Sequence, residues 1–348
     1  MLINNLLNSD HVRFFSLARY ALSEALRVSG VGETDYILIP EYICRDIIAP
    51  INVNNAQVVY YSVGEDLTPL EPPEMWPKAK AVLAVNYFGF PQNLSPFFQY
   101  AELTNAVIIE DNAHGLLSKD EKMQWLGMRA DIGIFSFRKT FCLSDGAALV
   151  LNKNQASIPM KVHLSPTGKG FNPTARIKCK IKDIPFIGVY LWVLFVILVR
   201  LFRKLRTGHA IPTMIKSHQY EIPYIGNPHR TLLNQLKRYN YDEKNEINRR
   251  RRLYHKVSIM AQNRGLVSIF DYLPDGTVPY GFPFRATEEE AALFSKRVRW
   301  LGLDLLKWPD LPDCISAAIT TARLVFESAL KALLAANLWC SKVCRFNT

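Results

Sequence analysis

Residues 107–115 read VIIEDNAHG, and residues 130–150 read ADIGIFSFRKTFCLSDGAALV. Each stretch contains a short apolar run that ends abruptly in polar residues, as a buried parallel strand does at its carboxyl end. A third run, AALVL, follows the turn signal SDG. Open α/β sheets place their ligands at the carboxyl ends of strands, so we expect the polar residues there to converge in one crevice. These residues are Asp111, His114, Ser136 and Lys139.

The chain before this stretch alternates predicted strands and helices, which indicates a mostly parallel sheet with helices on both faces. We predict a helix over residues 10–27 with Asp10 as its N-cap, because apolar residues recur at helical spacing. Strands are predicted at 34–40, 56–63 and 81–89, with a helical stretch at 41–55 and a helix at 97–106. The fold class is α/β.

The chain after residue 227 has the pattern of a small α+β domain. Helices are predicted over residues 229–263, 288–303 and about 315–343, and a strand over residues 276–286. We therefore expect a large domain over residues 1–227 and a small one over 228–348. The large domain contains a basic and apolar insert at about 160–207.

The composition narrows the class of protein. The 348 residues are 49% hydrophobic and 21% charged, which fits a well-buried globular protein. The six cysteines are scattered, with no CxxC pair, so we expect free thiols in the cytoplasm and no metal site. The net charge of +11 suggests an acidic partner, but no recognition motif supports nucleic acid. The four arginines at 249–252 are expected to lie on a solvated or acid-paired helix face.

An uncharged apolar run, IPFIGVYLWVLFVILV, spans residues 184–199 and has basic residues on both sides. It is shorter than the roughly 20 residues that a spanning helix needs. Flanking cations would attract anionic lipid head groups, so we favour contact of residues 184–202 with the surface of the inner membrane. A buried helix or subunit contact, and a true membrane span, stay open as alternatives.

The four residues at the strand ends suit one cofactor, although each has an ordinary structural explanation. A carboxylate held against a pyridine nitrogen keeps the ring protonated and makes it an electron sink. A lysine of depressed pKa can form a Schiff base and then move protons at the substrate carbon. A hydroxyl and a helix N-terminus can hold a phosphate. Together these groups favour pyridoxal 5'-phosphate.

Several motifs resemble the DegT/DnrJ/EryC1/StrS family of sugar aminotransferases, from about residue 10 to about 310 with the basic and apolar insert excluded. EDNAH at 110–114 resembles the family's E-D-x-A-[QH], and IGIFSF with the lysine and SDG resembles its G-x-FSF…K…[ED]-GG. VNYFGFP at 85–91, FFSLARYALSEALR at 14–27 and NRRRRLYHKV at 248–257 also have counterparts. The resemblance implies the fold-type-I architecture and a homodimer.

The resemblance also implies a role for each candidate residue. Lys139 would carry the cofactor, Asp111 would hold the pyridine nitrogen, and His114 would lie beside the ring. Ser136 would bind the phosphate with Ala18 and Arg19. The family's ring-stacking residue would fall at Tyr42 or Cys44. Asn227 would reach across the dimer interface to the phosphate in the partner's site. The departures are a shortened loop between Ser136 and Lys139, and alanine for glycine at positions 18 and 147.

The activity that this resemblance implies is transamination of a keto-sugar, nucleotide-linked, with glutamate or glutamine as donor, in envelope polysaccharide or related glycan synthesis. The alternative is a family member that has lost catalysis and serves as a membrane-associated partner in polysaccharide assembly. Cofactor-dependent dehydration is a third option, disfavoured because the family's dehydratases carry histidine at the position of Lys139. We expect a cytoplasmic protein that is peripheral on the membrane.

Overall fold

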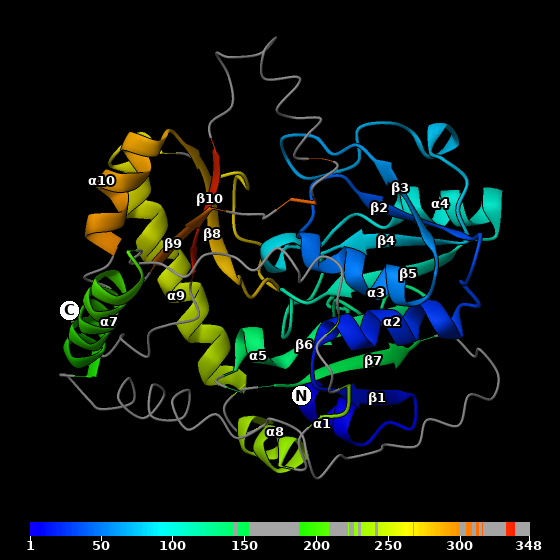
Figure 1. Ribbon diagram of the computed structural model, residues 1–348, viewed down its shortest axis with the longest axis horizontal. Helices are drawn as coiled ribbons and strands as arrows, with labels where there is room; N and C mark the ends of the chain where they lie inside the picture. The colour runs from blue at the N-terminus through cyan, green and yellow to red at the C-terminus, as the bar shows by residue number, and fades with distance from the viewer. Residues whose placement is uncertain are drawn as a thin grey trace.

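The computed structural model describes most of the first 152 residues and separate stretches beyond them. The described residues are 1–141, 143, 145–152, 188–208, 222, 226–228, 231–240, 243–266, 268–298, 304–307, 311–312, 315 and 332–337. A seven-stranded sheet forms the larger part of the structure (Figure 1). A three-stranded sheet with long helices beside it forms the smaller part.

The seven-stranded sheet has the order β1-β7-β6-β5-β4-β2-β3. Strands β3, β2, β4, β5 and β6 pair in parallel, whereas β7 is antiparallel to both β6 and β1. The strands are β1 (Val12–Phe15), β2 (Tyr36–Pro40), β3 (Gln57–Tyr61), β4 (Ala81–Val85), β5 (Val107–Asn112), β6 (Ile132–Ser136) and β7 (Ala147–Leu151). The predicted α/β class with a mostly parallel sheet is confirmed.

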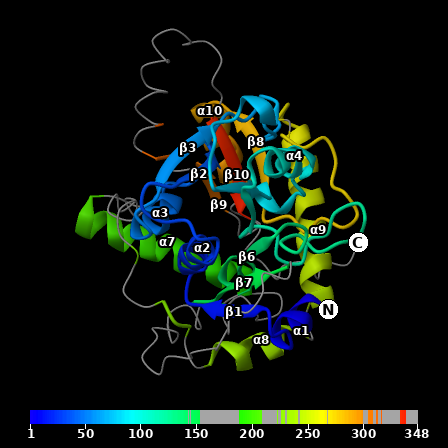
Figure 2. The same cartoon turned by 90° about the vertical axis from the view of Figure 1, so that its right-hand side faces the viewer.

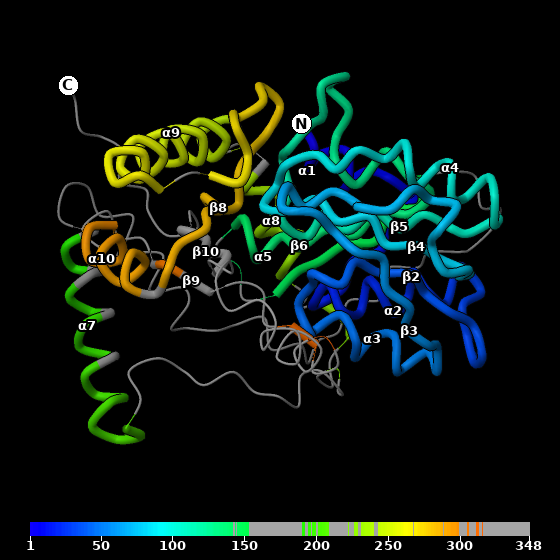
Figure 3. The backbone as a smooth tube through the Cα atoms, turned by 90° about the horizontal axis from the view of Figure 1, so that it is seen from above, coloured from blue at the N-terminus to red at the C-terminus, as the bar shows by residue number. Residues whose placement is uncertain are grey.

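Helices cover both faces of this sheet because successive strand residues point to opposite sides. Leu83 and Ile109 belong to the core under α2 (Ala18–Val28) and α3 (Ile48–Val53). Their neighbours Val82 and Ile108 belong to the core under α4 (Ser95–Thr104). Figure 3 shows α2 and α3 together on one side of the strands. Figure 2 shows α1 (Leu2–Leu7) and α8 (Leu232–Asn240) side by side next to β1.

The prediction of one helix over residues 10–27 is wrong in its first half. Residues Val12–Phe15 form β1, which pairs antiparallel with β7, and helix α2 begins only at Ala18 with Leu17 as its N-cap. The four residues bury most of their surface by pairing at the sheet edge, and this long-range pairing overrides the helical spacing. Helix α2 then buries Ala21, Leu22, Ala25 and Leu26.

The smaller sheet has the order β8-β10-β9 and is antiparallel. Its strands are β8 (Gly281–Ala286), β9 (Asp304–Lys307) and β10 (Ala332–Asn337). Helices α9 (Glu243–Gln262) and α10 (Glu288–Val298) lie beside it, and Tyr254 packs edge-on against Phe282 at 5.0 Å. The predicted C-terminal helix is wrong over 332–337, where pairing with two strands outweighs the helix propensity of alanine and leucine.

The expected acid pairing of the arginines at 249–252 is found at Arg249 and Arg250, which both pair with Glu246. The other alternative, a solvated face, does not apply to Arg250, whose side chain is only 1% exposed. The apolar run is not a buried helix: α7 (Gly188–Thr207) carries leucines that are more than half exposed, such as Leu194 and Leu205. Among the residues that the structure describes, no helix combines the length and apolar character needed to cross a membrane. Residues 184–187 of the run lie outside the described residues.

Candidate active site

One pocket opens at the carboxyl ends of β4, β5 and β6, where the sequence predicts a site. Strand β5 delivers Asp111 and, three residues on, His114. Strand β6 ends at Ser136, and the one-turn helix α5 (Phe137–Thr140) follows at once with Lys139. Seven of the nine candidate residues line this pocket: Lys139, Asp111, His114, Ser136, Ala18, Arg19 and Cys44.

Lys139 lines the pocket and is partly buried, and desolvation lowers the pKa of its ammonium group. The neighbouring Cys44 and Asp111 act in the opposite direction, while Arg138 adds to the lowering. A larger fraction of the amine is therefore neutral near pH 7 than in a solvated lysine. Only the neutral amine has the lone pair that attacks a carbonyl or accepts a proton.

Burial also raises the pKa of the Asp111 carboxyl group, and the positive charge of Lys139 opposes that rise. The backbone N–H of Ala113 donates a hydrogen bond of 2.9 Å to Asp111 Oδ1, which fixes the direction of the carboxylate. A second positive charge inside the pocket would further favour the ionised form. The site thus holds an acid that is suited to pair with a cationic ring nitrogen.

His114 is buried, and burial together with the nearby charge of Lys139 lowers its pKa well below the ordinary value. The ring is therefore neutral near pH 7. Its Nδ1 accepts a hydrogen bond of 3.4 Å from the backbone N–H of Phe88, so the geometry assigns the ring proton to Nε2. The ring of Tyr280 stacks on it with centroids 4.5 Å apart and planes 3° from parallel.

The N-terminus of α2 forms the opposite end of the pocket, with Ala18 and Arg19 as its first two residues. Backbone N–H groups at such a position lack partners within the helix and attract anions. The Nη1 atom of Arg19 is buried without a hydrogen-bond partner, and its Nη2 atom lies 3.9 Å from Asp46 Oδ2. The Nη1 atom of Arg19 is therefore free to donate a hydrogen bond, and a bound phosphate would accept it.

Ser136 and Arg138 border the same end of the pocket. Ser136 is buried, and its register partner is Ala147 in β7. Desolvation and the positive charge of Arg19 lower the pKa of Arg138. These groups fit a dianionic phosphate. Gly146 has a φ of +124°, and a Cβ there would meet Leu232, whereas Ala147 lies in a regular strand that accepts alanine.

Two candidate residues lie outside this pocket lining. Tyr42 precedes Cys44 by two residues, and its backbone carbonyl accepts a hydrogen bond of 2.8 Å from the Tyr87 hydroxyl. Burial raises the pKa of the Tyr42 hydroxyl. Asn227 is exposed and follows Gly226, whose carbonyl accepts from the backbone N–H of Ser16 at 2.9 Å. Of the two residues considered for ring stacking, the structure places only Cys44 at the pocket.

Sequence reasoning missed four residues that shape the site. Arg138 is adjacent to Lys139, so its position alone could have revealed it. Tyr280 and Arg250 reach the site from distant parts of the chain, and no local signal marks them. Arg129 precedes β6 and forms hydrogen bonds of 2.9 and 2.6 Å with Glu110 Oε1, behind Asp111. The glutamate of EDNAH could have suggested a buried partner for such a cation.

The fold and the pocket define the class of protein. A mostly parallel seven-stranded sheet with a smaller antiparallel sheet, and a lysine and an acid at the carboxyl edge, is the architecture of fold-type-I pyridoxal-phosphate-dependent transferases. The model of the DegT/DnrJ/EryC1/StrS aminotransferase family matches residues 3–175. Through this half of its length, the chain belongs to that family.

Individual relatives agree with this assignment. The chain is 25% identical over 158 residues to the GDP-perosamine synthase of Escherichia coli O157:H7, which covers 43% of each protein. It is 26% identical over 151 residues to dTDP-3-amino-3,4,6-trideoxy-alpha-D-glucose transaminase of Streptomyces venezuelae, covering 41% of this chain and 39% of that enzyme. The matches thus span about two fifths of these relatives.

The fold is similar over a longer stretch. The PLP form of Spr1654 from Streptococcus pneumoniae superposes with a TM-score of 0.63 at 16% identity, covering 99% of this chain and 86% of that one. At this level of identity the likeness concerns the fold.

Proposed function

We propose that the chain is a pyridoxal-phosphate-dependent aminotransferase that converts a keto-sugar, carried on a nucleotide, to an amino-sugar. Glutamate or glutamine is the amino donor. The observation that carries the proposal is the convergence of Lys139, Asp111, His114 and the N-terminus of α2 in one pocket. Both named relatives act on nucleotide-linked sugars, as their names state, and this supports the substrate class.

The cofactor, when bound, supplies an electron sink for charge that develops at the substrate carbon. Lys139 would hold the cofactor and, once free, would move a proton at the substrate carbon, for which the lowered pKa of its amine is suited. Asp111, which lines the same pocket, would pair with the ring nitrogen and keep it protonated. The neutral His114 lines the pocket and would lie beside the ring.

The phosphate end of the cofactor is held by groups at the start of α2. The backbone N–H groups of Ala18 and Arg19, the Ser136 hydroxyl and the Arg19 guanidinium are the donors. Anchoring the phosphate fixes the distance from Lys139 to the reacting carbon, so binding energy at one end of the pocket orients the chemistry at the other.

The visible absorption of the cofactor bound to a lysine tests the proposal. Reconstituted wild-type protein should show this band, and borohydride followed by peptide mapping should place the label on Lys139. Lys139→Ala should lack the band and the activity. Lys80→Ala is the matched control, since Lys80 pairs with Asp35 at the surface, with its amine 2.9 Å from the carboxylate. A borohydride-sensitive band that survives in Lys139→Ala would refute the assignment.

The proposal includes a homodimer in which Asn227 reaches the phosphate of the partner's site. Asn227 is exposed and does not line the pocket of its own chain, which suits a residue offered to a second copy. Light scattering should give twice the chain mass. Asn227→Ala should bind the cofactor more weakly while its circular dichroism is unchanged; unaltered cofactor affinity would exclude this role.

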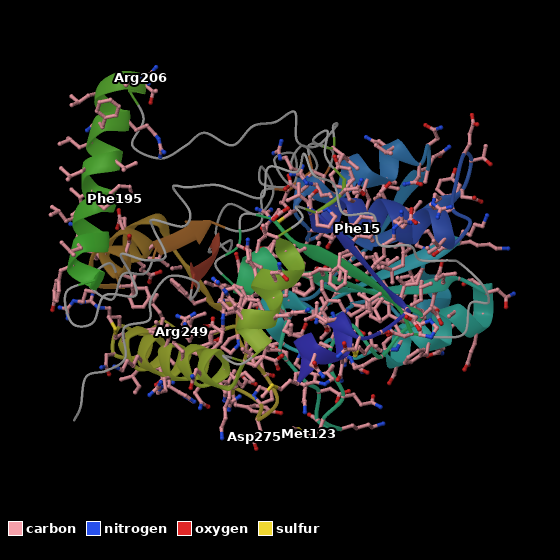
Figure 4. All side chains as sticks on the ribbon, turned by 90° about the horizontal axis from the view of Figure 1, so that it is seen from below. Phe15, Met123, Phe195, Arg206, Arg249 and Asp275 are labelled. Atoms are coloured by element: carbon pink, nitrogen blue, oxygen red, sulfur yellow. The ribbon has the colours of Figure 1, made fainter. Side chains whose placement is uncertain are left out.

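We also propose that the protein works on the cytoplasmic face of the membrane, in glycan synthesis, and that α7 contacts the lipid surface. A continuous apolar stripe along this helix faces outward: Tyr190, Leu194, Ile197, Leu198, Leu201 and Leu205 are each more than half exposed. Lys204 and Arg206 are exposed, and the ~100° turn per residue places them on either side of the stripe. Figure 4 shows Phe195 and Arg206 on this helix at one edge of the molecule.

Such a helix, with apolar side chains between cations, is suited to lie in the interface of an anionic bilayer. The full chain should sediment with vesicles of phosphatidylcholine and phosphatidylglycerol, and less with phosphatidylcholine alone. Leu201→Glu should abolish binding, and Arg206→Gln should weaken it about fivefold, the effect of ~1 kcal/mol per cation. Equal binding to both vesicle types, or unchanged binding by Leu201→Glu, would refute lipid contact through α7.

A further inference from the structure

Helix α5, which carries Lys139, is a single turn of four residues, Phe137–Thr140. A helix this short is not stable by itself, and its last carbonyl groups have no partners within it. One guanidinium from the smaller part of the structure supplies partners. Arg250 Nη2 donates a hydrogen bond of 2.9 Å to the carbonyl of Thr140, and the carbonyl of Lys139 lies at 3.4 Å.

The same guanidinium contacts two other segments. Its Nε lies 2.6 Å from Glu246 Oε1 within α9, and its Nη1 lies 3.4 Å from the carbonyl of Pro279. The next residue, Tyr280, stacks on His114, and its ring centroid lies 6.0 Å from Lys139 Nζ. One buried side chain therefore connects α9, the backbone of the cofactor lysine and the segment that supports the pocket histidine.

We propose that Arg250 is a positioning residue for Lys139: its positive charge caps the C-terminus of α5 and fixes that helix relative to Tyr280 and His114. A cation at a helix C-terminus is favourable because the free carbonyls carry partial negative charge. The catalytic side of the inference rests on the proposed role of Lys139.

The neighbouring arginines show that the role belongs to one residue rather than to a basic run. Arg249, which Figure 4 labels on α9, also pairs with Glu246, at 2.5 Å. Arg251 donates to the carbonyls of Pro274, Asp275 and Thr277. Arg249→Gln is therefore a matched control that removes one cation from the same glutamate and keeps the hydrogen bond from Arg250 to Thr140.

The test compares Arg250→Gln, Arg250→Lys and Arg249→Gln. In cofactor-free protein, amide hydrogen exchange of residues 137–141 should be about tenfold faster in Arg250→Gln, partly restored in Arg250→Lys, and unchanged in Arg249→Gln. This measurement needs neither cofactor nor substrate, so it stays informative if the proposed function fails. Where Arg250→Gln does not fold, the comparison of Arg250→Lys with Arg249→Gln decides.

In the reconstituted protein, the pH midpoint of the visible cofactor band should shift in Arg250→Gln by about half a pH unit or more, because Lys139 is displaced relative to Asp111. A merely structural residue would lower thermal stability and leave this midpoint in place. A folded Arg250→Gln with wild-type exchange at 137–141 would overturn the inference, as would a midpoint equal to that of Arg249→Gln.

Discussion

The imidazole ring of His114 and the phenol ring of Tyr280 lie 4.5 Å apart and within 3° of parallel, although 166 positions separate them in the chain. Tyr280 is fixed by a backbone hydrogen bond of 2.7 Å from its N–H to the carbonyl of Phe88. Phe88 in turn donates its N–H to His114 Nδ1. Residues from both parts of the structure thus set the orientation of the pocket histidine.

Removal of the Tyr280 ring should therefore loosen His114 and weaken cofactor binding. Aromatic stacking contributes ~0.5–1.5 kcal/mol beyond buried area, so Tyr280→Ala should raise the dissociation constant of pyridoxal phosphate about tenfold. Tyr280→Phe keeps the ring and should stay within about threefold of wild type. Titration of the visible band measures both. Equal affinity in the alanine and phenylalanine variants would contradict the stacking argument.

The arginines at the phosphate end give a prediction that separates phosphate recognition from ring recognition. Arg138→Met and Arg19→Met should each weaken pyridoxal phosphate by tenfold or more, since a hydrogen bond to a charged group contributes ~1.5–3 kcal/mol. Binding of pyridoxal, which lacks the phosphate, should be almost unchanged. Arg27→Met, on the same helix but paired with Glu24, serves as control. Equal losses for the two ligands would exclude phosphate contact.

The ion pair behind Asp111 should be among the strongest single contributions to stability in the larger sheet. Glu110 is fully buried, Arg129 is 8% exposed, and the Asn86 amide adds a bond of 2.9 Å to the same carboxylate. Glu110→Gln leaves the buried guanidinium with only the more distant carboxylate of Asp120, 3.6 Å from Arg129 Nη1, and should cost about 3 kcal/mol in urea unfolding. Asp35→Asn, which breaks the more exposed pair with Lys80, should cost less than about 1 kcal/mol. Similar losses of unfolding free energy in the two variants would contradict the larger contribution of the buried pair.

Local pattern was sufficient for the central strands and the residues at their ends. The apolar runs of β4, β5 and β6 are buried on both faces, so each reads as a continuous run ended by polar residues. Because parallel strands place their ligands at their carboxyl ends, the sequence also predicted that Asp111 and Lys139 lie in one crevice. Family resemblance, rather than pattern, supplied the position of Arg19 at the start of α2.

The elements that sequence reasoning missed depend on contacts between distant residues. Strand β1 exists because it pairs with β7, more than 130 positions away, and its own residues fit a helix equally well. Strand β10 likewise depends on β8 and β9. Arg250 appeared as one of four equivalent arginines, and only the approach of Thr140 distinguishes it. These partners lie too far apart in the chain for a local sequence pattern to reveal the contacts.

The stability of the protein should fall in acid through Glu246. The guanidinium groups of Arg249 and Arg250 lower its pKa from 4.5 to about 2 against the opposing effect of burial. The folded state therefore binds this proton less readily than the unfolded state, so the contribution is complete above about pH 4.5 and is lost as the pH falls toward 2. A shift of this size corresponds to about 3 kcal/mol as an upper value.

Urea unfolding at a series of pH values from neutral to acid checks this. Glu246→Gln should be less stable than wild type at neutral pH, and the difference should shrink as the pH falls, because the wild-type carboxylate becomes protonated. Glu65→Gln is the control, since Glu65 is 90% exposed and pairs with Arg285 at 3.2 Å. That variant should follow the wild-type curve. A difference between Glu246→Gln and wild type that stays constant into acid would mean that the pair with Arg250 contributes through packing rather than charge.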